Sequence, residues 1–453
     1  MDPSLSSLTI LDFAILPFVV GFIFLIAYRM RDKKYSRKNP LRKYYIPALS
    51  VKVFGAIFIG LVYGYYYGGG DTYFYFNQAQ VVNSAFNESI IKWLNLLLHI
   101  PSSTDPNYYS YISQMEWYND PASYTVVSIT AFLSFFTLNT YLPTAVLFAF
   151  ISFSGVWALF RTFAALYPNL IRPIAVSILF IPSVVVWGSG IFKDTICLFG
   201  LGWLTYGTFR FMMQRDFTSR NILISVLSFF LIARVKLYIL LSFLPALLMW
   251  IFFNYTQRIK NKSQKLLVKF ILLSMVVGGS IFFMQQFANE LGKYSLEKVA
   301  QTSKLTGNYI YWVSGDEGSS YSLGDFSPSI GGMLSKFPMA VNVTLFRPYI
   351  WEAKKIIVLL SALEAILFLF VTLKILFTIK LAKIWEAISF DPTIQFCLIF
   401  AIIFAFAVGI SSYNFGALSR YKIPCLPFYA LATVLIYYKN RPLNKKLLGI
   451  INF

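Results

Sequence analysis

Residues 8–43 read LTILDFAILPFVVGFIFLIAYRMRDKKYSRKNPLRK, an apolar run that ends in a dense cluster of lysines and arginines. The apolar part, about 8–28, has the length of roughly 20 residues that a helix needs to cross a bilayer. Basic residues beside a span favour the cytoplasmic side of the membrane. Because the basic residues follow the apolar run and none precedes it, the segment predicts a first span with an external N-terminus, and not a cleavable signal peptide.

The rest of the chain repeats this pattern of apolar stretches and polar connections. Hydrophobic residues make up 57% of the sequence and charged residues only 13%, whereas roughly a quarter of the residues of soluble proteins are charged. The apolar stretches run at about 8–28, 46–67, 142–165, 173–188, 191–213, 221–235, 238–254, 268–285, 356–379, 393–411 and 423–438. We therefore expect an all-α fold: a polytopic transmembrane helix bundle of about eleven spans that forms a single integral-membrane domain over 1–453.

The connections between these stretches alternate in charge. If the basic segment 29–43 is cytoplasmic, every second connection is basic; these connections carry Arg161 and Arg172, then Arg210, Arg215 and Arg220, then 258–269, then Lys380 and Lys383, and last 439–446. This is the positive-inside pattern. It predicts a multi-pass protein of the cytoplasmic membrane with the N-terminus outside and the C-terminus in the cytoplasm.

The same alternation accounts for the formal net charge of +20. A nucleic-acid binder would concentrate its positive charge on a folded surface and not in short loops between apolar spans. The sequence therefore predicts membrane lipid, and no nucleic acid, as a partner.

Few residues are available for metal or nucleophilic chemistry. Cys197, Cys397 and Cys425 all lie in apolar stretches, where free cysteine behaves as a small apolar residue. The single histidine, His99, excludes His-rich metal sites. We expect no disulfide framework, no metal and no other cofactor.

Two connections are long, at about 69–141 and 286–355, and both are predicted to lie outside. The first contains an amphipathic stretch at about 78–99, which predicts an interfacial helix. It also contains an apolar piece at 124–138, which we interpret as re-entrant or interfacial, since a crossing there would place every later basic loop outside. Loops of this length are more often functional than idle, so the second could cover a site.

Glycines dominate the end of the second predicted span. Gly60, Gly64 and Gly68 share one face, and the run 68–70 ends the helix just before Asp71. Asp71 is either a solvated aspartate at a helix end or a general base held at the membrane surface. In the second case Tyr73 would face a sugar or a lipid.

The next polar cluster is Lys193 and Asp194, which follow the turn Gly188-Ser189-Gly190. Asp194 could simply complement a helix N-terminus, with Lys193 as its surface counter-ion. The short outer turn places both charges near the lipid headgroups, where charge is costly unless it is paired or used.

Arg234 and Lys236 lie between two predicted spans on the outer side, against the positive-inside preference. A phosphate or pyrophosphate would supply a partner, because arginine offers a forked match to phosphate oxygens. Pairing of these cations with Asp71 or Asp194 is the structural alternative, and the two roles are compatible.

Further charges precede two of the last three spans. Arg347 and Glu352 precede the span at 356–379, and Arg420 and Lys422 precede the final one. Glu364 lies within a span, where a carboxylate has either a functional or a hydrogen-bonded packing role.

Cations that hold a phosphate leaving group, together with a carboxylate that takes a proton from a sugar hydroxyl, suit transfer from a polyprenyl-linked sugar. The predicted catalytic residues are Asp71, Asp194 and Glu352, and the predicted substrate- or phosphate-binding residues are Lys193, Arg234, Lys236, Arg347, Arg420, Lys422 and Tyr73. The expected substrate is a polyprenyl-linked sugar or oligosaccharide.

Two motifs, GGGDTYFYF at 68–76 and SGIFKDTI at 189–196, carry a family resemblance. The chain resembles the GT-C class of integral-membrane glycosyltransferases, the EpsG-like exopolysaccharide proteins and, more loosely, the O-antigen polymerases. The resemblance implies polysaccharide assembly from undecaprenyl-linked donors, with Asp71 as the base and outer-loop arginines on the pyrophosphate. The chain departs from the family in lacking an Asp-x-Asp or Glu-x-Asp pair after the second span, and in having Lys193 where the exopolysaccharide type has arginine.

The expected function is glycosyl transfer or repeat-unit polymerisation in cell-surface polysaccharide assembly, on the outer face of the cytoplasmic membrane. Two alternatives stay open. A transporter or flippase of a lipid-linked or anionic substrate would place functional charges at the bilayer midplane and on both faces. A non-catalytic subunit of an envelope complex would depend on envelope-assembly partner proteins.

Overall fold

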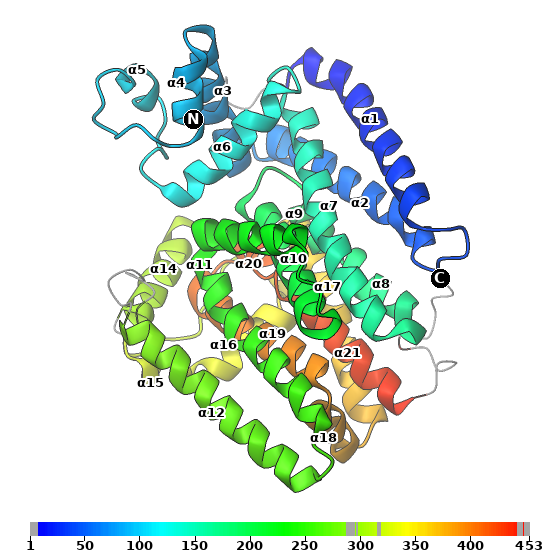
Figure 1. Ribbon diagram of the computed structural model, residues 1–453. Coiled ribbons are helices and arrows are strands. Elements are labelled where there is room, and N and C mark those ends of the chain that lie inside the picture. The colour runs from blue at the N-terminus through cyan, green and yellow to red at the C-terminus, as the bar shows by residue number, and fades with distance from the viewer. Residues whose placement is uncertain (1–7, 287–294, 296–297, 315–318, 442–446, 448–453) are drawn as a thin grey trace. The chain divides into compact units, whose positions relative to one another are not determined.

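The computed structural model describes residues 8–286, 295, 298–314, 319–441 and 447 (Figure 1). Within these residues all regular structure is helical, apart from one isolated bridge between Ser320 and Asn414. The prediction of an all-α fold is confirmed. The chain divides into two compact units, Met1–Leu237 and Tyr238–Phe453.

Unit 1 contains a series of long and short helices. They are α1 (Ile10–Lys34), α2 (Arg42–Leu61) with a π-helical extension (Val62–Tyr66), α3 (Asp71–Ser84), α4 (Ile90–Leu97), α5 (Tyr109–Ile112), α6 (Pro121–Phe135), α7 (Tyr141–Leu166), α8 (Ile171–Leu179), α9 (Pro182–Trp187), α10 (Lys193–Gln214) and the first part of α11 (Ser219–Tyr255).

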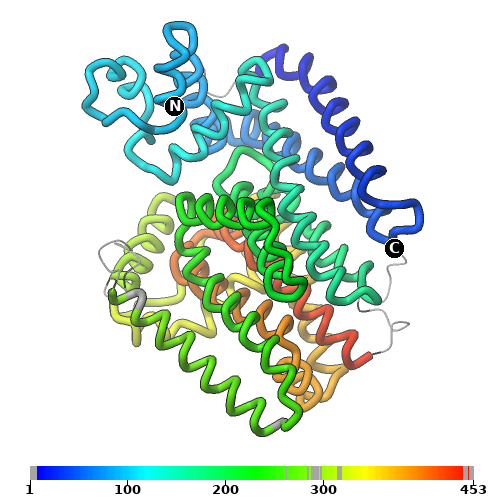
Figure 2. The backbone as a smooth tube through the Cα atoms, viewed as in Figure 1, coloured from blue at the N-terminus to red at the C-terminus, as the bar shows by residue number. Residues whose placement is uncertain are grey.

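Unit 2 contains the remainder of α11 and the helices that follow. These are α12 (Lys262–Gln286), α14 (Val299–Ser314), α15 (Ile330–Ser335), α16 (Phe337–Phe346), α17 (Ile356–Thr378), α18 (Leu381–Phe390), α19 (Pro392–Ser412), α20 (Phe415–Tyr421) and α21 (Leu426–Asn440). In Figure 2 the tube of α19 (orange) runs beside that of α21 (red), and the two helices pack on each other.

Helix α7 forms the centre of unit 1, where it packs against α10, α2, α1 and α8 (Figure 1). Its contact with α10 brings two backbones together. A Cβ atom added to Gly202 would lie 1.9 Å from the carbonyl oxygen of Gly155, and one added to Gly155 would lie 2.4 Å from that of Phe199. Only glycine permits this approach, which is the usual role of small residues between membrane helices.

The start of α7 is joined to the start of α1 by a buried carboxylate. Asp12 is 3% exposed and accepts a hydrogen bond from the backbone nitrogen of Leu142 at 3.0 Å. It also accepts from the backbone nitrogen of Thr9 at 2.9 Å, which caps α1. One side chain therefore satisfies N-terminal backbone donors of both helices.

The first long connection is a folded helical layer. The predicted helix at 78–99 appears as α3 and α4, joined by a short 3₁₀ turn, and the predicted piece at 124–138 appears as α6. Asn83 of α3 donates to the carbonyl of Ala131 of α6 at 3.0 Å and accepts from the indole of Trp93 of α4 at 2.9 Å. With 15 residues, α6 is shorter than the roughly 20 that a span needs.

The second long connection, predicted at 286–355, also contains packed helices among its described residues. Helix α16 packs on α19, where the Thr344 hydroxyl donates to the carbonyl of Ala405 at 2.8 Å. A Cβ on Gly409 would lie 2.2 Å from the carbonyl oxygen of Ala340. The apolar face of α16 needs burial, which α19 provides.

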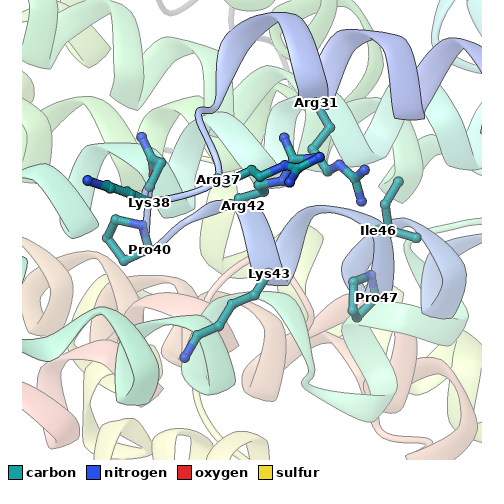
Figure 3. A pocket seen from close by; sticks show the side chains of 9 residues that line it. Arg31, Arg37, Lys38, Pro40, Arg42, Lys43, Ile46 and Pro47 are labelled. Atoms are coloured by element: carbon teal, nitrogen blue, oxygen red, sulfur yellow. The ribbon is translucent and has the colours of Figure 1, made fainter.

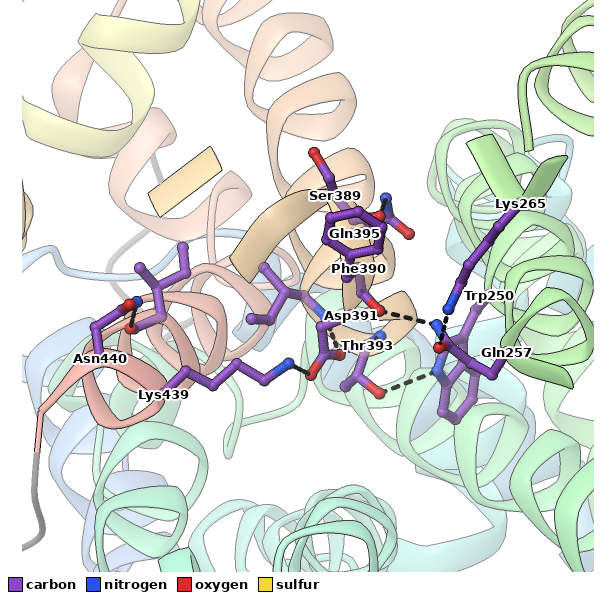
Figure 4. Close-up of polar contacts among 12 residues, drawn as sticks. Trp250, Gln257, Lys265, Ser389, Phe390, Asp391, Thr393, Gln395, Lys439 and Asn440 are labelled. Atoms are coloured by element: carbon purple, nitrogen blue, oxygen red, sulfur yellow. Dashed lines mark hydrogen bonds and ion pairs between the residues drawn. The ribbon is translucent and has the colours of Figure 1, made fainter. Parts of the chain in front are cut away.

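Polar contacts in unit 2 gather at the two ends of α19. At the C-terminus of α19, the backbone nitrogen of Tyr321 donates a hydrogen bond to the carbonyl oxygen of Tyr413 at 3.0 Å. At its N-terminus, Figure 4 shows Lys439 and Asp391 pointing toward one another, with Nζ and Oδ2 2.5 Å apart, and Gln257 donating to the carbonyl of Phe390 at 2.8 Å. Since α19 has 21 residues, the two sets lie about 30 Å apart along its axis.

Seven helical segments among the described residues are long and apolar enough to cross a membrane. They are Ile10–Lys34, Arg42–Tyr66, Tyr141–Leu166, Ser219–Arg258, Ser263–Phe282, Ile356–Thr378 and Pro392–Ser412. This supports a membrane protein, but the predicted number of about eleven spans is not confirmed.

Local breaks account for part of the difference in span number. The predicted span at 173–188 is two short helices, because Pro182 lacks a backbone donor and begins α9 at the first helical position. The predicted spans at 221–235 and 238–254 form α11, whose one non-helical residue is Lys236 with φ −147° and ψ 77°.

We predict that Gly202→Ala lowers the stability of unit 1 by about 1–3 kcal/mol, because the added methyl group forces α7 and α10 apart. The matched control is Gly21→Ala in α1, where a Cβ would meet no atom within 4 Å. Alanine is the better helix former, so this control should be neutral or slightly stabilising. The midpoint of unfolding in detergent measures both, and equal effects would contradict the close contact.

Candidate functional site

The predicted site residues form two groups, one in each unit. Unit 1 holds Asp71, Tyr73, Lys193, Asp194, Arg234 and Lys236, and unit 2 holds Arg347, Glu352, Arg420 and Lys422. The groups are described separately.

Asp194 and Lys236 form a buried ion pair in unit 1. Lys236 Nζ lies 2.5 Å from Asp194 Oδ1, and the two side chains are 8% and 0% exposed. Asp194 lies in the first turn of α10, where the helix dipole also favours a negative charge. This is the pairing that the sequence left open as the structural alternative to a phosphate site.

A buried lysine that sequence reasoning missed lies in α2. Lys52 is 2% exposed, and its ammonium group donates to the carbonyls of Gly188 at 2.6 Å and Val184 at 3.2 Å, and to the Ser152 hydroxyl at 3.3 Å. The carbonyls come from the C-terminal end of α9, where a cation is favoured. A lysine inside an apolar span was the available signal, because intramembrane charges are rarely idle.

Lys193, next to Asp194 in the sequence, pairs with a different carboxylate. Its Nζ lies 3.4 Å from Asp120 Oδ2, at the N-terminus of α6. Burial raises the pKa of Asp120, but the hydrogen bond from Ser123 and the charge of Lys193 more than offset this, so the pKa lies below its ordinary value. Lys193 therefore joins α10 to the first helical layer.

Asp71 begins α3 and is half-buried. It follows Gly68, Gly69 and Gly70, whose φ angles are +64°, +128° and +123°. Only glycine adopts such conformations readily, so the predicted break after the second span is confirmed. The break lets the chain turn from α2 into α3.

Tyr73 contributes to packing. Its ring stacks on Tyr141 with centroids 4.1 Å apart, and its hydroxyl donates to the carbonyl of Gly60 at 3.2 Å. The Gly60 and Gly64 face predicted from spacing is indeed closely contacted, but by the side chains of Tyr141, Leu142 and Tyr73. The buried Tyr73 ring is thus part of the interior of unit 1.

Arg234 is exposed in α11, two residues before the break at Lys236. It lies near His99, at the end of the first helical layer. Burial lowers the pKa of His99, and the Arg234 guanidinium lowers it further, while a hydrogen bond with the Tyr118 carbonyl partly offsets both.

In unit 2, Arg347 is held rigidly. It forms an ion pair with Glu352, with Arg347 Nε 3.1 Å from Glu352 Oε2. The hydrogen bond to Glu352 raises the pKa of Arg347, and the opposite charge adds to this. The guanidinium carbon lies 6.0, 5.7 and 5.3 Å from the ring centroids of Tyr321, Tyr349 and Phe415. Cation–π contacts of this kind fix the orientation of the group.

Lys422 contacts the backbone of Arg347. It is 1% exposed, and its Nζ donates to the carbonyl oxygen of Arg347 at 3.4 Å. Burial lowers the pKa of Lys422, whereas the Glu364 carboxylate in α17 raises it. Arg420, 7% exposed, lies two residues before Lys422 at the end of α20.

The structure therefore brings together Arg347, Glu352 and Lys422, with Glu364 acting on Lys422. Arg420 is a neighbour of Lys422 in the sequence, at the end of α20. Arg347 is paired with Glu352, and the Glu364 carboxylate acts on the buried Lys422. Arg347 keeps 23% of its side chain exposed, so the cluster has one cation at its surface. We call these residues the Arg347 cluster.

No group of three or more His, Cys, Asp or Glu side chains among the described residues could hold a metal ion. The chain matches no family model, no curated protein and no solved structure. The residues themselves are therefore the basis for a functional proposal.

We predict that Asp194→Asn costs about 3–5 kcal/mol of stability, because it removes the carboxylate from a buried ammonium group. A double variant, Asp194→Asn with Lys236→Met, should recover much of the loss, since it removes the buried charge as well. The neighbouring Lys193→Ala, whose partner Asp120 is 50% exposed, should cost no more than about 1 kcal/mol. Denaturant unfolding measures all three, and equal losses at Lys193 and Asp194 would refute the buried pair.

Proposed function

We propose that the protein transfers a sugar, or polymerises an oligosaccharide repeat unit, from a polyprenyl (pyro)phosphate donor during assembly of cell-surface polysaccharide. The observation that carries the proposal is the Arg347 cluster. A guanidinium held by a carboxylate and aromatic rings offers a fixed, forked donor for phosphate oxygens. The buried Lys422, whose ammonium group donates to the Arg347 carbonyl, supplies a second cation nearby.

The location of the cluster supports a lipid-linked substrate. Arg347 and Glu352 lie just before α17, one of the candidate membrane spans, so the guanidinium is near the end of an apolar helix. Trp351, next to Glu352, is 81% exposed, as is common for tryptophan at the membrane interface. A polyprenyl chain would lie in the bilayer while its phosphate meets the cations.

In the proposed reaction the acceptor hydroxyl oxygen bonds to the anomeric carbon, and the bond from that carbon to the phosphate oxygen breaks. Cations lower the barrier by stabilising the departing phosphate. Asp71 stays the predicted base for the hydroxyl proton, on the grounds of its position after the glycine break at 68–70 and of the family resemblance. Asp194 and Glu352 are bound to Lys236 and Arg347, so we assign them to positioning these cations.

We further propose that the protein lies in the cytoplasmic membrane, with the N-terminus outside and the C-terminus in the cytoplasm. The basic connections support this orientation. About eleven crossings would result if α8 with α9, α10 and α21 also cross and if α11 crosses twice around Lys236.

A transporter or flippase is the second candidate. The buried Lys52, inside the candidate span formed by α2, favours it, because charges within spans often lie on ion or substrate pathways. An enzyme and a transporter would differ in whether the lipid-linked donor is consumed.

We predict that Arg347→Ala weakens the binding of undecaprenyl phosphate by about 10–100-fold, because a charge-assisted contact to phosphate is lost. Arg347→Lys should recover only part of it, since lysine has no forked donor geometry. Native mass spectrometry of the purified protein with added lipid measures this. The exposed Lys355→Ala, at the start of α17, is the matched control.

Cells provide the functional arm of this test. Arg347→Ala should abolish surface polymer, whereas Asp71→Asn should retain lipid binding and lower the transfer rate by about 10²–10⁴-fold. Unchanged lipid binding by a folded Arg347→Ala variant would refute the phosphate site. Movement of the donor lipid to the other leaflet, with its sugar linkage unchanged, would favour the flippase.

We also predict opposite exposure of the two ends of unit 2. Asp325→Cys, at a fully exposed position, should react with a membrane-impermeant maleimide on intact cells. Lys383→Cys, at a position that is 64% exposed, should react only after the membrane is opened. The wild type is the background control, because its three cysteines are buried. Labelling of both from one side would contradict a crossing by α17, and the reverse pattern would overturn the orientation.

A further inference from the structure

A cavity of about 410 Å³ in unit 1 is lined by cations from the C-terminal ends of three long helices. Lys34 ends α1, Arg161 lies in the last turns of α7, and Arg210 lies near the end of α10. Tyr35 and Tyr206 also line the cavity. We call it the Arg161 cavity.

Aromatic contacts fix the central guanidinium. Arg161 Nη2 donates to the Tyr206 hydroxyl at 2.7 Å, and its guanidinium carbon lies 4.6 Å from the centroid of the same ring. Tyr35 is held in turn by the indole of Trp157, which donates to its hydroxyl at 2.8 Å. The side chains of Arg161 and Tyr35 are therefore held in place by contacts within the protein, before any ligand binds.

The charge of the cavity is poorly balanced by the protein itself. Lys34 is repelled by Arg161 and by Arg220. Arg210 pairs with Asp216, which does not line the cavity, but its Nε is buried and has no hydrogen-bond partner among the described residues. The lining contains no Asp or Glu. A buried donor without a partner costs free energy unless a ligand or water supplies an acceptor.

Apart from Asn39 and Gln214, the remaining lining is apolar. Ala164, Ile171 and Phe209 face the same space as the cations. A cavity that is cationic on one side and apolar on another matches a molecule that combines a phosphate with a hydrophobic part.

A second basic cavity, of about 370 Å³, is lined by the connection between α1 and α2 and shares Asn39 and Pro40 with the first. Figure 3 shows the side chains of Arg31, Arg37 and Arg42 gathered there. Asp32 neutralises part of this charge, since one of its oxygens lies 2.7 Å from both Arg31 and Arg42. In the Arg161 cavity Asp216 does the same for Arg210, but among the described residues no ion pair joins Lys34 or Arg161 to a carboxylate, so we take this cavity as the stronger anion site.

The general preferences for basic residues at helix ends explain why cations occur at the ends of α1, α7 and α10, but not why three of them line one cavity. The positive-inside preference and the helix dipoles both favour basic residues at these helix ends. Neither requires that Lys34, Arg161 and Arg210 line one cavity in spite of their mutual repulsion. A bound dianion would turn this repulsion into attraction.

We propose that the Arg161 cavity binds a phosphate group, carried by an anionic phospholipid of the cytoplasmic leaflet or by a soluble phosphate. Arg161 and Lys34 bind the phosphate oxygens, and the charge of Arg210 adds to the attraction. The inference stands apart from the proposed transferase function, because its residues do not belong to the Arg347 cluster.

The test uses purified full-length protein in a nonionic detergent. Phosphatidic acid, phosphatidylcholine and inorganic phosphate are added separately, and binding is followed by native mass spectrometry and by the midpoint of thermal unfolding. We expect phosphatidic acid to bind at least tenfold more tightly than phosphatidylcholine, which carries no net charge. Lys34→Ala and Arg161→Gln should each weaken this binding by about tenfold.

Matched controls separate the cavity from general surface charge. Lys33→Ala removes the neighbouring cation of the same helix turn, and Arg215→Gln removes an exposed cation beyond α10; neither residue lines either cavity. Both controls should retain binding. Lys34 lies at the exposed end of α1, so its variant keeps the test valid even if Arg161→Gln fails to fold.

The outcomes identify the source of the phosphate or overturn the proposal. Binding of phosphatidic acid that inorganic phosphate does not displace supports a lipid. Stabilisation by inorganic phosphate alone, lost in Lys34→Ala, supports a soluble phosphate. The proposal is overturned if neither probe binds, or if Lys33→Ala and Lys34→Ala lower binding equally.

Discussion

The free-energy cost of a charge in a low-dielectric interior is the constraint on which this structure depends. Asp194 and Lys236 offset this cost by pairing with each other, and Lys52 offsets it by donating hydrogen bonds to backbone carbonyls. In unit 2, the buried Lys422 has the Glu364 carboxylate nearby and a carbonyl acceptor at Arg347. Each pairing joins segments that are distant in the sequence, so the buried charges specify which helices meet.

Close backbone contacts also determine which helices meet, without any charge. Gly155 and Gly202 let α7 and α10 touch, and Gly409 does the same for α19 against α16. With α7 and α10 in contact, the N-terminal turn of α10 is held firmly, and it carries both Lys193 and Asp194. Packing of small residues thus positions the charges, and the charges then restrict the packing to one arrangement.

The two cationic sites differ in how their arginines are satisfied. Arg347 has a carboxylate partner and an aromatic surrounding, which suits a fixed contact with a phosphate at the end of a membrane helix. Arg161 is held by a neutral tyrosine, and its cavity lining has no carboxylate, which leaves a larger share of its charge for a ligand. Both arrangements use rigid guanidinium groups, because a pre-oriented donor loses less conformational freedom on binding.

Much of the local structure could be predicted from the sequence because it depends on neighbouring residues. Apolar length predicts the helices, and the glycines at 68–70 predict the break before Asp71, since only glycine adopts those φ angles readily. Tertiary structure decided the partners. Lys193 pairs with Asp120 and Lys236 with Asp194, Tyr73 is buried against Tyr141, and α16 packs where a loop was expected. These outcomes depend on which segments meet in space, and hydrophobic periodicity and residue spacing do not contain that information.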